Sequence, residues 1–265
     1  HLGHAYSAIL AHDMARAAGG EFLLRIDDLD QSRARPEWEH QIYDDLRWLG
    51  LNWDGPVRRQ SEHFNEYSEQ LERLRQQRLT FECHCTRRDI EAAANAPQEG
   101  VADFGPDGRI YPGTCRQLAL KPQNQACTRL NMAKACTMGL PTSFCETGPQ
   151  RAGQHDLNAK DLINTVGDVV LSRRDMSASY HLSVVIDDAA CGISHVIRGQ
   201  DLYEATKIHV VLQRLLDLPT PTYHHHDLIR DENGKRLAKR DDARAIAKYR
   251  ADGATPADIR RMVGL

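Results

Sequence analysis

The order of the first predicted elements limits the fold most strongly. Residues 5–16 are rich in alanine and carry apolar side chains on one helical face, and Gly19-Gly20 ends that pattern. Residues 21–26 follow as a short apolar strand. A helix that leads into a buried strand is typical of an open, doubly wound sheet, whose ligands bind beyond the carboxyl ends of the parallel strands. We therefore predict an α/β fold with a doubly wound parallel sheet.

Three carboxylates stand where that first strand is expected to end. Asp27, Asp28 and Asp30 follow residue 26 almost directly. Carboxylates at such a place can coordinate Mg²⁺, hold an ammonium group, or cap the next helix. The residues alone leave these three alternatives open.

Hydrophobic periodicity predicts most of the other elements. Amphipathic helices are expected at residues 36–49, 61–78 and 201–218. Short runs rich in β-branched or aromatic residues predict strands at 166–171, 180–186, 193–197 and 223–229. A last short helix is expected after Thr255. The consecutive histidines 224–226 lie on a predicted strand, where side chains alternate between faces, so we do not expect them to bind one metal ion.

Composition limits the class of protein. The 265 residues suffice for one large domain, and 34 Lys and Arg against 37 Asp and Glu give a formal net charge of -3, which excludes a general polycation. Seven cysteines, an odd and unevenly spaced set, argue against a secreted disulfide scaffold and indicate a cytoplasmic protein with reduced thiols or a metal site. No apolar run approaches the roughly 18 residues that a membrane span needs, and no signal segment is expected.

Two distant stretches have the chemistry of a phosphate site. His1-Leu2-Gly3-His4 places two imidazoles around a glycine just before a helix, where phosphates bind readily. Residues 231–243 carry four cations in six positions, namely Lys235, Arg236, Lys239 and Arg240. Residues 230–250 have a net charge of +4, from eight basic and four acidic residues, and are the expected electrostatic contact for an RNA. A solvated basic loop is the alternative for this stretch.

Residues 81–116 interrupt the pattern and contain close cysteines. Cys83, Cys85 and Cys115 can supply three thiolates to a small zinc site, and buried free thiols are the alternative. From chemistry alone the fourth ligand is open. His84 is the usual ligand type, yet its side chain would point away if Cys83 and Cys85 converge from a strand.

The two phosphate motifs, H-x-G-H and a late G-K-x-L-x-K-R, resemble the signatures of the class I aminoacyl-tRNA synthetases. Three further stretches resemble the glutamyl branch of that family: F-L-L-R-I-D-D-L-D at 22–30, Y-H-L-S-V-V-I-D-D at 180–188 and I-S-H-V-I-R-G-Q-D at 193–201. Only about 25 residues follow the cationic loop, too few for an anticodon-binding domain, so the chain is most similar to the short paralogue of glutamyl-tRNA synthetase. Because the chain opens on the first histidine of its own motif, we expect the preceding strand and loop of the family to lie outside it.

The resemblance implies the Rossmann-like catalytic domain of class I synthetases with a zinc-binding insertion. We expect the first half of that domain at residues 1–80, the insertion and a connecting segment at 81–160, and the second half, with the cationic loop and a short helical end, at 161–265. It also implies ATP-dependent activation of L-glutamate, with Mg²⁺ accompanying the ATP. The glutamyl group then passes to queuosine in the anticodon loop of tRNA(Asp). We expect a monomer.

The same resemblance assigns roles to single residues. His1 and His4 act as catalytic residues on the phosphates, with Lys239 holding the departing pyrophosphate; the ATP-binding set is His1, Gly3, His4, Arg236, Lys239 and Arg240. Glutamate is expected to contact Asp27, Tyr180 and Arg198. The family pattern C-x-C followed by Y-x-x-x-C implies Cys83, Cys85, Tyr111 and Cys115 as zinc ligands.

Some residues depart from the family pattern. Asp27 stands where a longer glutamate is usual, Ala238 replaces a serine, and Arg236 replaces a lysine. Another H-x-G-H nucleotidyltransferase acting on a small molecule, a truncated glutamyl-tRNA synthetase-like protein and an inactive zinc-containing RNA-binding paralogue are the alternative functions.

Overall fold

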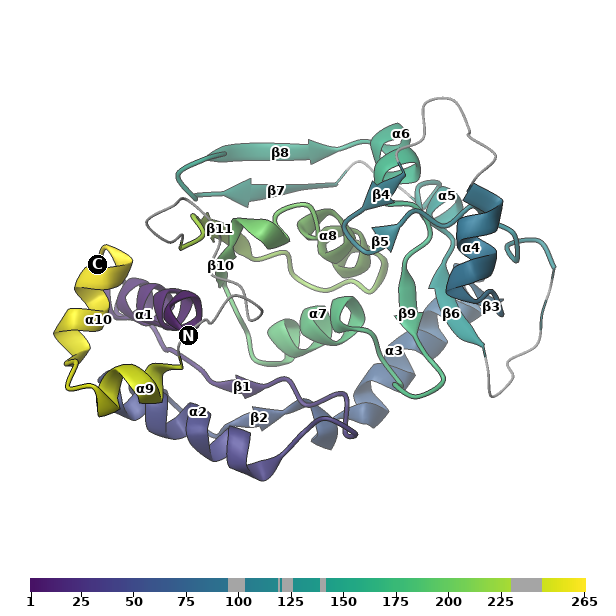
Figure 1. The fold of residues 1–265 in the computed structure, drawn as a ribbon. Helices are drawn as coiled ribbons and strands as arrows, with labels where there is room; N and C mark the ends of the chain where they lie inside the picture. Colours follow the sequence, from purple (N-terminus) through teal and green to yellow (C-terminus); the bar gives the residue numbers. More distant parts are fainter. Residues whose placement is uncertain (95–102, 119, 121–125, 139–141, 230–244) are drawn as a thin grey trace.

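The computed structural model describes residues 1–94, 103–118, 120, 126–138, 142–229 and 245–265 (Figure 1). Within these ranges, three groups of elements follow one another across the molecule in Figure 1: the N-terminal helices packed with the last helices, a central sheet with two helices, and a second small sheet. No helix in the described ranges combines the length and apolar character that a bilayer crossing requires.

The first group joins the two ends of the chain. Its elements are α1 (Leu2–Ala17), β1 (Arg25–Ile26), α2 (Pro36–Trp48), β2 (Arg58–Arg59), α9 (Ile246–Ala251) and α10 (Pro256–Val263). After β2 come η1 (Gln60–Glu62) and α3 (Phe64–Gln76), and α3 packs on the central helix α7. The predicted helices at 5–16, 36–49, 61–78 and after Thr255 are confirmed, and α1 starts three residues earlier than expected. α1 packs on α10 through a core that includes Leu2, Ile9 and Ile259.

The central sheet is mixed, with strand order β10-β11-β7-β8. Its strands are β10 (His195–Gly199), β11 (Thr222–His226), β7 (Thr142–Glu146) and β8 (Gly153–Leu157). β10, β11 and β7 run parallel, whereas β8 is antiparallel to β7, and the parallel pair β1–β2 forms a sheet of its own. The prediction of one doubly wound parallel sheet is therefore wrong in detail for the described residues, although a parallel core is present.

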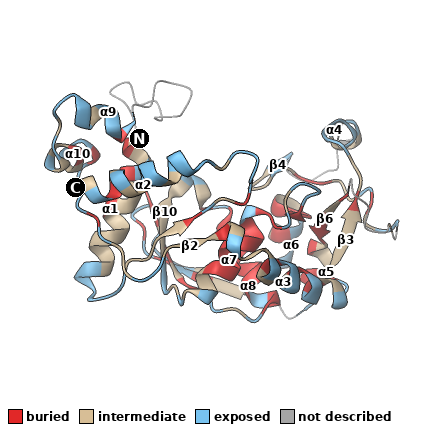
Figure 2. Cartoon of the chain, turned by 90° about the horizontal axis from the view of Figure 1, so that it is seen from below, coloured by how far each residue is buried: buried red, intermediate tan, exposed pale blue. Residues whose placement is uncertain are grey.

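The segment predicted as a strand at 180–186 is a helix, α7 (Tyr180–Ala190). Its seven consecutive residues from His181 to Asp187 are all buried, and Ser179 caps its first turn by accepting from Leu182 N. A helix that is buried on all sides shows no hydrophobic period, so its β-branched residues favoured the strand interpretation. α7 packs against α8 (Thr206–Leu215), with the short η3 (Gln200–Leu202) before it, and Figure 2 shows α7 as a buried element of the interior.

The second small sheet is antiparallel, with order β3-β6-β9. It comprises β3 (Thr80–Cys83), β6 (Cys127–Leu130) and β9 (Val170–Ser172). A hairpin of β4 (Phe104–Gly105) and β5 (Gly108–Arg109) lies near it. The helical elements around it are α4 (Arg87–Ala94), α5 (Met132–Ala135), α6 (Ala159–Asp161) and the π-helical turn η2 (Leu162–Val166). The strand predicted at 166–171 begins only at Val170, because η2 ends at Gly167, whose φ of 70° a side chain would strain. The two sheets do not follow the expected boundary at residue 160. β7 and β8, which precede it, pair in the central sheet, and β9, which follows it, pairs with β6 in the second small sheet.

Candidate active site

The H-x-G-H motif lies at the carboxyl ends of the central strands. Ser7, in the second turn of α1, lies 2.7 Å from Nε2 of His226, the last residue of β11. The rings of His1 and His4 stack at 3.6 Å between centroids, and a Cβ on Gly3 would come within 3.3 Å of the His1 ring. Glycine between the two histidines thus leaves room for the His1 ring, and the motif faces the edge of the sheet at which such folds bind ligands. Arg236, Lys239 and Arg240 lie outside the described residues.

Arg198 on β10 sits in a polar network. Its Nε donates to His225 Nε2 and its Nη1 to His209 Nδ1, both at 3.0 Å. Its Nη2 donates to Thr206 Oγ1 at 2.7 Å and to the Leu202 carbonyl at 3.3 Å. These bonds engage four of the five N–H groups of a guanidinium. A carboxylate that binds Arg198 bidentately must therefore replace one of them.

Tyr180 and Asp27 lie near this arginine. Tyr180 is the first residue of α7 and not a strand-edge residue as predicted. Burial raises its pKa, and the charges of Arg198, Asp27 and Arg25 all act on its hydroxyl. Arg25 on β1 donates to Asp27 Oδ1 and to Asp188 Oδ1, each at 2.7 Å. The Tyr180 ring lies 5.8 Å from that of His209, a partner of Arg198, and Arg25 bridges the carboxylates of Asp27 and Asp188.

The other two aspartates after β1 have local partners. Asp28 accepts from the Ser61 amide at 2.8 Å and from its hydroxyl at 2.6 Å. Asp30 accepts from the Ser32 hydroxyl at 2.5 Å. Neither of them caps the next helix, α2, whose N-cap residue Arg35 makes no side-chain capping bond; Asp28 and Asp30 instead fix the chain around Ser61 and Ser32.

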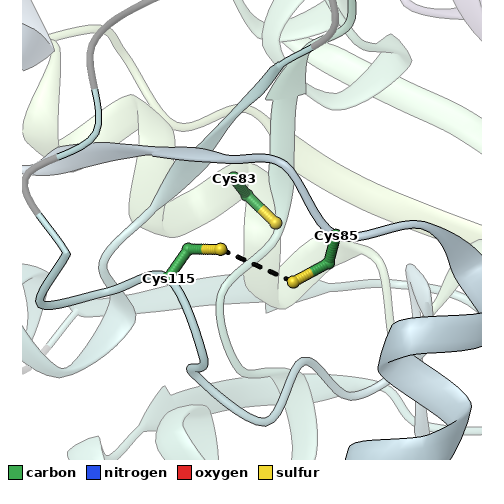
Figure 3. Close-up of side chains that lie close together, drawn as sticks. All are labelled: Cys83, Cys85 and Cys115. Atoms are coloured by element: carbon green, nitrogen blue, oxygen red, sulfur yellow. Dashed lines mark hydrogen bonds between the residues drawn. The ribbon is translucent and has the colours of Figure 1, made fainter.

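The three predicted cysteine ligands converge, as Figure 3 shows. The sulfurs of Cys83, Cys85 and Cys115 all lie within 4.8 Å of one another, and Cys85 Sγ is 3.5 Å from Cys115 Sγ. Tetrahedral zinc with bonds of about 2.3 Å to sulfur needs sulfurs about 3.8 Å apart. The Tyr111 hydroxyl is 3.4 Å from Cys85 Sγ. The donor set and its spacing therefore fit a zinc ion.

His84 stands apart from this group. Its ring nitrogens are not among the ligand atoms that cluster with the three sulfurs, and its Nε2 is buried without a hydrogen-bond partner in the described ranges. Tyr111 is buried, and its hydroxyl oxygen accepts from the Cys115 amide at 2.8 Å. The geometry of the fourth position thus favours Tyr111 over His84.

A buried cation accompanies the thiols. The Arg129 guanidinium carbon lies 4.2 Å from the centre of the Tyr111 ring, and Arg129 is buried. Hydrogen bonds from Cys127, Tyr111 and Arg129 hold the pKa of Cys83 well below its usual value. A positive charge beside several thiolates stabilises the deprotonated form that a metal requires.

Sequence reasoning missed several residues of the Arg198 network. His209, His225 and Glu146 come from α8, β11 and β7, so no local spacing connects them. The run of three consecutive histidines was the one feature in the sequence that marked this region. Their side chains have different partners, as expected for residues that alternate between the faces of a strand. His224 lies against Thr147, His225 faces Arg198 and Glu146, and His226 meets α1.

Comparisons with known proteins agree with these features. The family model described as tRNA synthetases class I (E and Q), catalytic domain, matches residues 1–265. The glutamyl-Q tRNA(Asp) synthetase of Rhodobacter capsulatus is 62% identical over 269 residues, covering 100% of this chain and 95% of that protein. The protein of the same name from Nocardia farcinica is 41% identical, covering 98% and 78%.

Solved structures give the same relationship. A glutamate tRNA ligase from Elizabethkingia meningosepticum, in complex with its amino acid, superposes with a TM-score of 0.77 at 25% identity. The match covers all of this chain and 58% of that one, so this chain spans less than two thirds of that relative. The methionyl-tRNA synthetase of Mycobacterium tuberculosis shares the fold, with a TM-score of 0.58 at 10% identity. The chain belongs to the class I tRNA synthetases of the E and Q group.

Proposed function

We propose that this protein activates L-glutamate with ATP and transfers the glutamyl group to queuosine in the anticodon loop of tRNA(Asp). The observation that carries the proposal is the 62% identity, over the whole chain, with a glutamyl-Q tRNA(Asp) synthetase. The site supports it, because carboxylate, phenol and guanidinium groups meet beside the H-x-G-H motif. We place the reaction in the cytoplasm, where its tRNA is found.

Glutamate would bind between the charged groups near α7. Arg198 binds a carboxylate of the substrate, Tyr180 contacts it from the start of α7, and Asp27 attracts the α-ammonium group. The bond between Asp27 and Arg25 supports this role, since it fixes one carboxylate oxygen at 2.7 Å and orients the other. Asp188, on the opposite side of Arg25, keeps that arginine in place.

ATP would bind at the start of α1 together with Mg²⁺. His1, Gly3 and His4 contact the phosphates, and Arg236, Lys239 and Arg240 of the cationic loop hold the pyrophosphate. An α-carboxylate oxygen of glutamate attacks the α-phosphorus, the new P–O bond forms, and the bond to pyrophosphate breaks. These groups act by positioning and by stabilising negative charge, which is the main need of such a displacement.

In the second step a queuosine hydroxyl attacks the activated carbonyl, loses its proton, and AMP departs. We propose that a monomer performs both steps. Residues 1–80 and 161–265, together with β7 and β8 of the central sheet, would form the catalytic domain, and the rest of residues 81–160 would form the zinc-binding insertion and its connection. The net charge of +4 over residues 230–250 supports a contact with tRNA.

ATP–pyrophosphate exchange with each amino acid in turn, without tRNA, tests the first step on the full-length protein. Exchange with glutamate alone is expected. Transfer of labelled glutamate to tRNA(Asp) with and without queuosine then tests the second step. Exchange with no amino acid would refute the proposal, and exchange followed by charging of an acceptor end would redirect it to an ordinary synthetase.

Zinc would be held by Cys83, Cys85, Cys115 and Tyr111, and it would stabilise the loop-rich insertion. Metal analysis of the purified protein should give about one zinc per chain, and Cys115→Ala should abolish it. Tyr111→Phe should weaken zinc retention against a chelator, whereas the matched control His84→Ala should not. The opposite result for these two variants would make His84 the fourth ligand.

A further inference from the structure

Two chains of linked contacts start at the Arg198 guanidinium: a short chain through His225 to Glu146, and a long chain through His209 and His181 toward Asp107. An arginine side chain can only donate, so the two ring nitrogens that it meets, His209 Nδ1 and His225 Nε2, must be acceptors. Burial lowers the pKa of both rings, which keeps them neutral. Each ring therefore carries its proton on the other nitrogen: His209 on Nε2 and His225 on Nδ1.

The short chain ends on β7. His225 Nδ1–H donates to Glu146 Oε2, and Glu146 Oε1 also accepts from the His225 amide at 2.9 Å and the Gly148 amide at 2.6 Å. Glu146 and His225 are both buried. With three donors on its two oxygens, this carboxylate is fixed, and so is the ring that it holds.

The long chain runs through two further helices. His209 Nε2–H donates to His181 Nδ1 at 3.0 Å, which leaves the His181 proton on Nε2. That Nε2 faces Asp107 Oδ1 at 3.4 Å. Arg198 thus donates to His209 and His209 to His181, and the Nε2–H of His181 lies at ion-pair distance from the Asp107 carboxylate.

Asp107 belongs to the turn between β4 and β5, far from Arg198 in sequence. Its Oδ2 accepts from the Val170 amide at 3.1 Å. The hairpin lies so close to η2 that a Cβ on Gly105 would come within 2.4 Å of the Thr165 carbonyl oxygen. These contacts hold the carboxylate in place at the outer end of the chain.

We propose that Asp107, His181 and His209 are positioning residues that fix the plane of the Arg198 guanidinium for glutamate. The inference rests on the proposed function, because it takes Arg198 as a glutamate contact. It assigns to the β4–β5 hairpin, within the segment expected to bind zinc, a role in the amino-acid site. A guanidinium held at three nitrogens has a fixed plane, and its remaining N–H points in one direction toward a carboxylate oxygen of the substrate.

Steady-state ATP–pyrophosphate exchange tests this on the full-length protein. Asp107→Ala should raise the KM for glutamate about tenfold, as loss of such supporting hydrogen bonds does at other sites, while kcat and the KM for ATP change less than about twofold. Asp107→Asn should recover part of the loss, since its amide oxygen can accept from His181. Asp103→Ala removes an exposed carboxylate four residues earlier and is the matched control. A glutamate KM for Asp107→Ala equal to that of the control, or an equal rise for both substrates, overturns the proposal.

Histidine tautomers give a readout that does not depend on activity. Nitrogen-15 NMR of histidine-labelled protein should show the Nε2–H form for His181 and His209 and the Nδ1–H form for His225. Asp107→Ala should alter the His181 signals and leave those of His225 unchanged. An Nδ1–H form of His209 refutes the chain even if glutamate supports exchange. Absence of any exchange by the unmodified protein would instead refute the proposed function, and the tautomers would still decide the chain.

Discussion

Replacing Asp187 with alanine should lower the free energy of unfolding by about 4 kcal/mol. This fully buried carboxylate on α7 accepts from Arg58 Nε at 2.7 Å, the Tyr67 hydroxyl at 2.8 Å and Gln60 Nε2 at 2.8 Å. Tyr67 and Gln60 are buried, and each unsatisfied donor costs about 1–3 kcal/mol. Arg58 keeps Glu66 as a partner, so its share is smaller. The sum is a large part of a typical folding free energy of about 5–15 kcal/mol.

Urea unfolding followed by circular dichroism measures this change. Asp187→Asn should cost about half as much, because the amide still accepts with one oxygen but places a donor opposite other donors. Asp44→Ala, an exposed aspartate on α2, is the control and should shift stability by less than about 0.5 kcal/mol. If Asp187→Ala unfolds within 1 kcal/mol of the unmodified protein, the idea that the buried donors of Tyr67 and Gln60 depend on this carboxylate is wrong.

Three further predictions concern stability. Burial lowers the folded-state pKa values of His209 and His225 from 6.5, so below that pH the unfolded chain binds more protons than the folded one. Stability should be full above pH 6.5 and fall below it, by at most about 1.4 kcal/mol per ring at pH 5.5, and an unfolding midpoint that is flat from pH 7.5 to 5.5 would contradict this. Thr255→Ala removes the hydroxyl that accepts from the Asp258 amide in the capping box at α10, while the residue-255 amide can still donate to Asp258. It should cost about 1 kcal/mol in the same urea assay, whereas Thr255→Ser should cost less. Gly105→Ala places a Cβ against the Thr165 carbonyl and should lower the thermal midpoint by several degrees; an unchanged midpoint would show that the hairpin can move away.

The sequence predicted the elements with clear periodicity. α1, α2, α3 and α10 each have one apolar face and a recognisable start or stop, so local rules suffice for them. α7 was misread because burial on all sides removes the period that separates helix from strand. The mixed direction of the central sheet was also beyond local rules, since β8 is a hairpin return of β7 and its pairing is set by the tertiary fold.

The residues of the candidate sites also differ in how far local sequence patterns predict them. The cysteine spacing of the insertion was sufficient to predict that three sulfurs would meet, because C-x-C places two thiols within a few ångströms. The polar network of Arg198 was not predictable. Its members Glu146, His181, His209 and Asp107 come from four separate elements, and only the folded chain decides which buried polar group finds which partner.

Because α1 packs on α10, α1 can complete its packing only after α10 has been synthesised. The motif helix buries Leu2 and Ile9 against Ile259, and Asp13 pairs with Arg260, so its packing partner is synthesised about 250 residues later. At 5–20 residues per second a ribosome needs roughly 10–50 s to supply it. Until then the motif helix exposes apolar surface, which chaperones and proteases recognise. A nascent chain released early therefore lacks the surface on which α1 packs in the folded protein.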